Sequence, residues 1–350
     1  MPMPRSRFPA SAPSRGAAGA AAGLASRAHG RARARAREGA PAPATVRAVA
    51  RARLEQVMEK VAPLLVVVDD DPALILAGEE VHDFRVAVRR LRSWLRACEP
   101  LLAGDMPRPL RAGLRKLARR AGRARDAQVQ WQWLSALPVP HTAGAGRAAA
   151  WFAARRAADF AAEYERLKEQ VAARWPALGA ALGEALREHP APVDGPAALT
   201  AHLGATIAHH ATAAQRALES IEHSTQVRVI HRARIQVKRL RYVVEAVGAP
   251  DPPAPAVRAA LKILRRLQDL LGEVHDAHVL TARVDEFLGQ PRRRRTARPA
   301  LRDLRALRAA LRRAELAAFR ASLDQLATPQ TAGMWTAIGA LATRLAAGIA

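Results

Sequence analysis

Apolar residues recur along most of the chain at the three-and-four spacing of α-helices, and no stretch alternates convincingly with the two-residue period of a strand. One stretch has apolar residues at Val81, Phe84, Val88, Leu91 and Leu95. Prolines and glycines interrupt the periodic stretches. The pattern predicts an all-α fold of long helices with short connections, which is typical of antiparallel bundles.

The breaks between periodic stretches divide the chain into nine predicted helices. They cover about residues 45–65, 78–98, 108–137, 147–189, 197–222, 225–247, 256–288, 299–326 and 333–349. Pro63 is expected to kink or end the first helix, and Pro176 to kink the fourth. The Pro/Gly-rich segment 189–196 is the best candidate for a boundary between two halves.

A polar stripe lies beside the apolar face of the helix predicted at 78–98. Its members are His82, Arg85, Arg89, Arg92 and Arg96. A helical turn of about 5.4 Å places about one of these side chains on each turn. Since the stripe borders the buried face, it lies where a groove between packed helices would form.

The same pattern returns 149 residues later, in the helix predicted at 225–247. The matched pairs are His82 and His231, Arg85 and Arg234, Arg89 and Lys238, Arg90 and Arg239, and Arg92 and Arg241. Segments 115–129 and 265–279 also match, at an offset of 150, and contain Asp126 and Asp276. These paired motifs indicate an internal duplication of a helical unit.

Both motifs resemble those of the CHAD family, the conserved histidine α-helical domain. The family pattern is H-x-x-R-x-x-x-R-R-L-R on a helix, followed by L-G-x-x-R-D-x-x-V. Both elements occur twice here, within residues 45–349. The sequence departs from the pattern at Lys238 and His275, where the family has arginine, and at Ala121, where it has leucine.

The resemblance implies two antiparallel, four-helix-type bundles related by a pseudo-twofold axis, with one repeat at about 45–189 and the other at about 197–349. It also implies that a basic cleft between the bundles binds inorganic polyphosphate, and that the protein associates with polyphosphate granules. The candidate binding residues are His82, Arg85, Arg89, Arg90, Arg92, Arg96, Arg115, Lys116, Arg119, His231, Arg234, Lys238, Arg239, Arg241, Lys262, Arg265 and Arg266.

The residue types on this list suit a phosphate chain. Guanidinium groups can hold phosphate oxygens through two parallel hydrogen bonds, and ammonium groups act as point charges. Asp126 and Asp276 are expected to pair with neighbouring arginines and orient them. His82 and His231 should be neutral beside arginines and become protonated when an anion binds, so binding should tighten at mildly acid pH.

The overall charge also favours a polyanionic partner. Lysine and arginine number 56 against 31 acidic residues, which gives a formal net charge of +25. Such a field attracts inorganic polyanions, nucleic acids or anionic membrane surfaces. Because only 4% of the residues are aromatic, stacking platforms for single-stranded nucleic acid are scarce. Non-specific nucleic-acid binding is the alternative function.

Enzymatic chemistry has little support in the sequence. There is no P-loop, no G-x-S-x-G motif and no cysteine-centred constellation, so a non-enzymatic protein without metal or cofactor is expected. His275-Asp276 is the basis for a less favoured hypothesis, a metal-dependent phosphohydrolase; Arg125-Asp126 occupies the matched positions. The string from Glu163 to Lys168 is interpreted as a solvated helix face.

The remaining features concern the compartment. Residues 1–44 are rich in arginine, alanine, proline and glycine and are predicted to form a disordered basic tail, with an organellar transit peptide as an alternative. The one cysteine, Cys98, indicates a reducing compartment. No run of about 18 apolar residues occurs, so no transmembrane helix is predicted. The expected location is cytoplasmic.

Overall fold

The computed structural model describes residues 42–66, 76, 78–102, 106–139, 144–187, 196–247, 254–289 and 299–348. Within these residues it contains α-helices, one short 3-10 helix and no strand, which confirms the predicted all-α class. The elements are α2 (Ala42–Leu65), α4 (Glu80–Ala97), η1 (Glu99–Leu102), α5 (Arg108–Ser135), α6 (Gly144–Ala185), α7 (Pro196–Glu219), α8 (Val227–Val247), α9 (Pro255–Gly289), α10 (Leu301–Leu326) and α11 (Pro329–Ala346).

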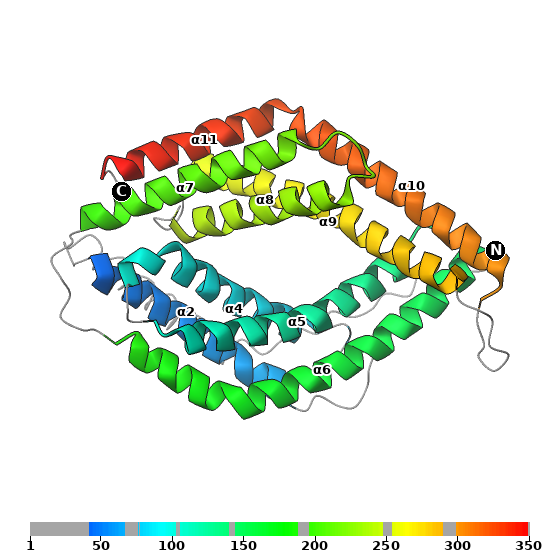
Figure 1. Ribbon diagram of the computed structural model, residues 1–350, viewed down its shortest axis with the longest axis horizontal. Helices are drawn as coiled ribbons and strands as arrows, with labels where there is room; N and C mark the ends of the chain where they lie inside the picture. The colour runs from blue at the N-terminus through cyan, green and yellow to red at the C-terminus, as the bar shows by residue number, and fades with distance from the viewer. Residues whose placement is uncertain are drawn as a thin grey trace, which may run out of the picture.

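The helices form two bundles that face each other across the molecule (Figure 1). Helices α2, α4, α5 and α6 pack together in the first bundle, and α7 to α11 pack together in the second. The bundles meet in two regions: α4 and α2 contact α8 and α7, and α6 contacts α10. Each bundle holds one of the two sequence repeats; their common origin and a twofold relation stay predictions.

Most helix bounds agree with the sequence pattern within about three residues, and capping chemistry accounts for the difference at the start of the last helix. The last helix begins at Pro329, four residues before the predicted start. The Thr328 hydroxyl accepts a hydrogen bond from the backbone N–H of Thr331 at 3.2 Å, and proline occupies the first helical position. Both features favour a helix start. Pro176 lies inside α6, which curves in Figure 1, and Pro63 lies near the end of α2.

Helix α4 carries the first polar stripe and is fixed on the side of its apolar face. The apolar positions at 81, 84, 88, 91 and 95 are all buried. Glu80 and Asp83 in the first turn and Arg96 in the last complement the helix dipole. The Lys60 ammonium donates to Asp83 at 2.8 Å, and the Trp94 indole N–H donates to the carbonyl of residue 46 at 3.0 Å. Both contacts bind α4 to α2 and set the direction of the stripe.

A second, smaller apolar core joins α5 and α6 to α9 and α10, far from the contact between α4 and α8 (Figure 1). It includes Phe152, Val284 and Leu307, with Trp131, Trp133, Trp151 and Phe287 packed against it. The Phe287 ring meets Phe152 and Trp151 edge-on, with ring centroids 5.2 and 5.3 Å apart. Edge-to-face aromatic contacts add to the free energy of burial, so this core holds the two bundles together at their far ends.

Several predicted segments lie outside the described residues. The tail before residue 42 and most of the predicted boundary at 189–196 and of the linker at 248–255 are among them. None of the helices in the described ranges is long and apolar enough to cross a membrane.

We expect Phe84→Ala to destabilise the fold strongly, because this side chain of α4 is 0% exposed. Removing a buried phenylalanine costs about 3–5 kcal/mol. Met58→Ala on α2 is the control, since Met58 is 54% exposed and its truncation should change stability by less than about 0.5 kcal/mol. Denaturant unfolding followed by circular dichroism checks both values; equal midpoints would contradict the assignment of Phe84 to the core.

Candidate functional site

A cavity of about 690 Å³ lies between the two bundles. Helices α4, α5 and α6 line it from the first bundle, and α8 and α9 from the second. Its charged residues and histidines are Arg85, Arg123, Arg156, Arg166, Arg234, Arg283, Asp126, Asp159, Glu163, Asp276, His231 and His275. Two matched pairs of the sequence repeats therefore share this cavity: Arg85 with Arg234, and Asp126 with Asp276.

The acids that α6 contributes are already engaged by arginines. Glu163 lies 3.0 Å from Arg120 and 3.1 Å from Arg123, and Asp159 contacts Arg156. The expectation that Glu163 belongs to a solvated face is wrong, because its side chain is only 19% exposed and faces α5. These ion pairs neutralise much of the charge on the α6 side.

Where α4 meets α8, by contrast, cations gather with few acids. Burial, together with Arg85, Arg89 and Arg234, lowers the pKa of Lys238 to about 7. Burial is also the main cause that lowers the pKa of Arg89 to about 10. Of these four cations only Arg85 has an acid within ion-pair distance in the described chain, Asp126 at 3.9 Å. Arg85 and Arg234 of this cluster line the cavity, whereas Arg89 and Lys238 lie next to them without lining it.

Several buried nitrogen atoms around the cavity have no hydrogen-bond partner among the described residues. They are Nε of Arg89, Arg156, Arg234 and Arg283, and Nδ1 of His231 and His275. Buried polar atoms usually have a partner, and an unsatisfied one costs about 1–3 kcal/mol. Oxygen atoms of a bound anion would supply acceptors for the four guanidinium groups.

The two histidines of the repeats lie in different surroundings. The His231 ring stacks at a tilt on His275, with ring centroids 4.8 Å apart, beside Arg234. Burial and Arg234 lower the pKa of both rings, that of His275 to about 4. His82 does not line the cavity; it lies 4.0 Å from Glu79, and burial and Arg125 lower its pKa. Burial and nearby arginines thus lower the pKa of both predicted histidines, and of the two only His231 lines the cavity.

The two aspartates also differ. Asp126 is 67% exposed and pairs with Arg85. Asp276 makes no ion pair within the described residues; burial raises its pKa to about 6, with a further contribution from the charge of Asp126. Asp126 thus has the expected arginine partner, whereas no arginine of the described residues lies within ion-pair distance of Asp276.

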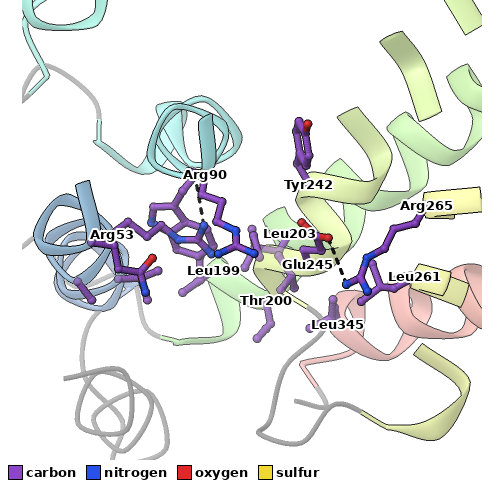
Figure 2. A pocket seen from close by; sticks show the side chains of 16 residues that line it. Arg53, Arg90, Leu199, Thr200, Leu203, Tyr242, Glu245, Leu261, Arg265 and Leu345 are labelled. Atoms are coloured by element: carbon purple, nitrogen blue, oxygen red, sulfur yellow. Dashed lines mark hydrogen bonds and ion pairs between the residues drawn. The ribbon is translucent and has the colours of Figure 1, made fainter. Parts of the chain in front are cut away.

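Other candidate residues lie elsewhere. Arg90 and Arg265 line a separate pocket where α2 and α4 meet the second bundle (Figure 2). Arg241 lies beside that pocket and contacts Glu245 at 2.5 Å. The guanidinium carbons of Arg89 and Arg241 lie over the Tyr242 ring, 4.5 and 4.7 Å from its centroid. Three more, Arg92, Arg96 and Arg115, line a groove on the first bundle.

The remaining five candidates are surface residues that line none of these three spaces. They are Lys116, Arg119, Arg239, Lys262 and Arg266. The candidate residues predicted to share one cleft therefore lie around the cavity, around the pocket lined by Arg90 and Arg265, in the groove on the first bundle, and on the exposed surface. The reason is geometric, since a stripe with three-and-four spacing drifts around a straight helix and its ends meet different neighbours.

Sequence reasoning missed the cavity residues of α6 and the end of α9. Arg156, Asp159, Glu163 and Arg166 follow a three-and-four spacing on one face of α6, and Arg283 lies seven residues after Asp276. These spacings can be seen in the sequence, but they belong to no repeated motif.

No group of three or more histidine, cysteine or acidic residues that could hold a metal occurs in the described ranges.

Comparisons with known proteins agree with this architecture. The family model of the CHAD domain matches residues 65–285. No curated protein matches. The crystal structure of the CHAD domain from the plant Ricinus communis is similar at a TM-score of 0.54 and 24% identity, covering 82% of this chain and 92% of that one. PptA from Streptomyces chartreusis is similar at a TM-score of 0.60 and 18% identity, covering 83% and 100%.

At these identities the two structures support the fold alone. The family match is stronger, because it spans more than half of the chain and contains both copies of the basic helix and of the aspartate motif. The described helices, the shared cavity and the matched motifs agree with it. This chain belongs to the CHAD domain family.

Proposed function

We propose that this protein binds inorganic polyphosphate in the cavity between its two bundles, the ligand that its family resemblance implies. The observation that carries the proposal is the cluster of Arg89, Arg234 and Lys238, which folding brings together without an ion pair in the described chain. Holding like charges together at reduced solvation costs free energy. A chain of phosphates offsets that cost, because successive units can neutralise several cations at once.

The chemistry of the lining favours phosphate over bases. Among its lining residues the cavity has no phenylalanine, tyrosine or tryptophan. The nearby Tyr242 is buried, and the guanidinium groups of Arg89 and Arg241 lie over its ring. Single-stranded nucleic acid gains much of its affinity from stacking on exposed rings. Non-specific nucleic-acid binding through surface charge is the alternative function.

The proposed role is binding without catalysis. The cavity side chains are donors and point charges, which hold a polyanion through salt-dependent contacts. A protein that binds long phosphate chains in this way would associate with polyphosphate granules in the cytoplasm.

We expect Arg85→Ala with Arg234→Ala to weaken long-chain polyphosphate binding by about 100-fold. Each charge-assisted hydrogen bond contributes about 1.5–3 kcal/mol, so even at the lower figure two such losses amount to roughly two decades in Kd. Fluorescent polyphosphate would be displaced by unlabelled polyphosphate or by single-stranded DNA of equal charge, at physiological salt.

The matched control is Arg174→Ala with Arg232→Ala, which removes one exposed arginine from each bundle. It should change affinity by less than about threefold, since exposed charges contribute weakly. If DNA competes equally and the cavity variant binds polyphosphate as well as the natural protein, the binding comes from surface charge and not from the cavity. That outcome would favour the nucleic-acid alternative.

We expect polyphosphate binding to tighten as pH falls from 8 to 6. In the free protein the Lys238 pKa is lowered to about 7 and the Asp276 pKa is raised to about 6. A bound anion raises both values, so the complex holds more protons than the free protein. Each proton taken up strengthens binding by at most about tenfold per pH unit.

The control for this dependence is Lys238→Arg, which keeps its charge throughout the range. It should flatten the increase between pH 8 and pH 7 and leave the part below pH 7 in place. Fluorescence anisotropy at constant ionic strength gives the slope, and an affinity that is constant across the range for both proteins would refute the proton uptake.

A further inference from the structure

A second basic site lies on the first bundle, in the groove between the C-terminal half of α4 and the start of α5. Its volume is about 380 Å³. The lining residues are Arg92, Leu95, Arg96, Glu99, Arg108, Arg111, Leu114 and Arg115. Five arginines and one glutamate therefore line this groove, and none of them lines the cavity between the bundles.

Most of the charge in this groove has no partner in the described part of the chain. Glu99 contacts Arg111. The guanidinium groups that make no ion pair there are those of Arg92, Arg96, Arg108 and Arg115. Burial and three neighbouring arginines lower the pKa of Arg92, and no acid counteracts them.

The second repeat has an internal counter-charge at the matched positions. By the offsets of the repeats, the residues that correspond to Arg92, Arg96 and Arg115 are Arg241, Glu245 and Arg265. The Glu245 carboxylate lies 2.5 Å from Arg241 and 3.5 Å from Arg265. Figure 2 shows the contact between Glu245 and Arg265. One acid thus holds both arginines of the second repeat.

Two further positions differ in the same direction. Gln268 accepts a hydrogen bond from Arg241 at 2.9 Å, and the first repeat has Ala118 at that position. Leu261 of the second repeat corresponds to Arg111. The first groove therefore has neither an acid at the position of Glu245 nor an amide at the position of Gln268. It has two more arginines, Arg96 and Arg111, of which Arg111 is paired with Glu99. If packing alone required these arginines, a glutamate would serve both repeats equally, so the difference points to a counter-ion from outside the chain.

We propose that the groove between α4 and α5 is a second anion site, separate from the cavity, that binds a condensed phosphate of a few units. Its residues carry a net charge of about +4, and the guanidinium groups converge from α4 and from the first two turns of α5. The unpaired N–H groups at the α5 N-terminus add partial positive charge on the same side.

The ligand would be a free short phosphate chain or one segment of a longer chain, and the second case rests on the proposed function of the cavity. Arg85 at the cavity and Arg96 in the groove are eleven residues apart on α4, about 16 Å along the helix axis. A long chain can reach both sites, and joining two sites through one ligand raises affinity without new contacts.

Calorimetric titration of the whole protein with tripolyphosphate and with long-chain polyphosphate tests the groove. The variant is Arg96→Glu, which gives the first repeat the acid of the second, and the control is Arg174→Glu, an equal charge change at an exposed site on α6. We expect two tripolyphosphate sites in the natural protein and the control, and one in Arg96→Glu. Long-chain affinity should fall at least tenfold in Arg96→Glu only.

Arg115→Ala is a second variant, at an exposed position where misfolding is not expected; it should weaken the groove site alone. Two undiminished sites in both groove variants would overturn the inference, as would a single site that only Arg85→Ala with Arg234→Ala removes. If the groove variants abolish all binding and that cavity variant abolishes none, the groove stands and the proposed function of the cavity falls.

Discussion

Bringing cations together beside a buried apolar face is the constraint on which the rest of this molecule depends. Helices α4 and α8 can bury their apolar faces only if Arg85, Arg89, Arg234 and Lys238 come close to one another. The apolar faces supply the free energy for this, at about 25 cal/mol per Å² of buried surface. The stability of the apolar core thus keeps these positive charges close together, in a place where water screens them less than it would on the surface.

Most of the fold could be predicted from the sequence, because the local spacing of apolar residues identifies helices of this kind. The apolar positions of α4 are all buried, and most helix bounds agree within a few residues. The start of α11 differed from its predicted position because a threonine cap and a proline determine where this helix begins. Such single residues do not contribute to the apolar periodicity on which the prediction rested. Residues far apart in the chain, such as Asp126 and Asp276, could be placed together only because the motif repeats.

The candidate site was less accessible, since a stripe on one helix does not reveal which neighbour each residue meets. Arg85 and Arg234 reach the same cavity, whereas Arg92 and Arg241, two members further along each stripe, have different partners. The contribution of α6 could not follow from the repeats, because it lies outside both motifs. Glu163 illustrates the difficulty: its neighbours Arg120 and Arg123 belong to another helix.

The aromatic core at the far ends of α5, α6, α9 and α10 has a mechanical consequence. The bundles touch at this core and again where α4 and α2 meet α8 and α7, so the contacts form a closed frame. Two bodies joined at one place can swing apart about a hinge, but two bodies joined at both ends cannot do so without breaking one joint. Such a frame opposes widening of the cavity that lies between the two joints.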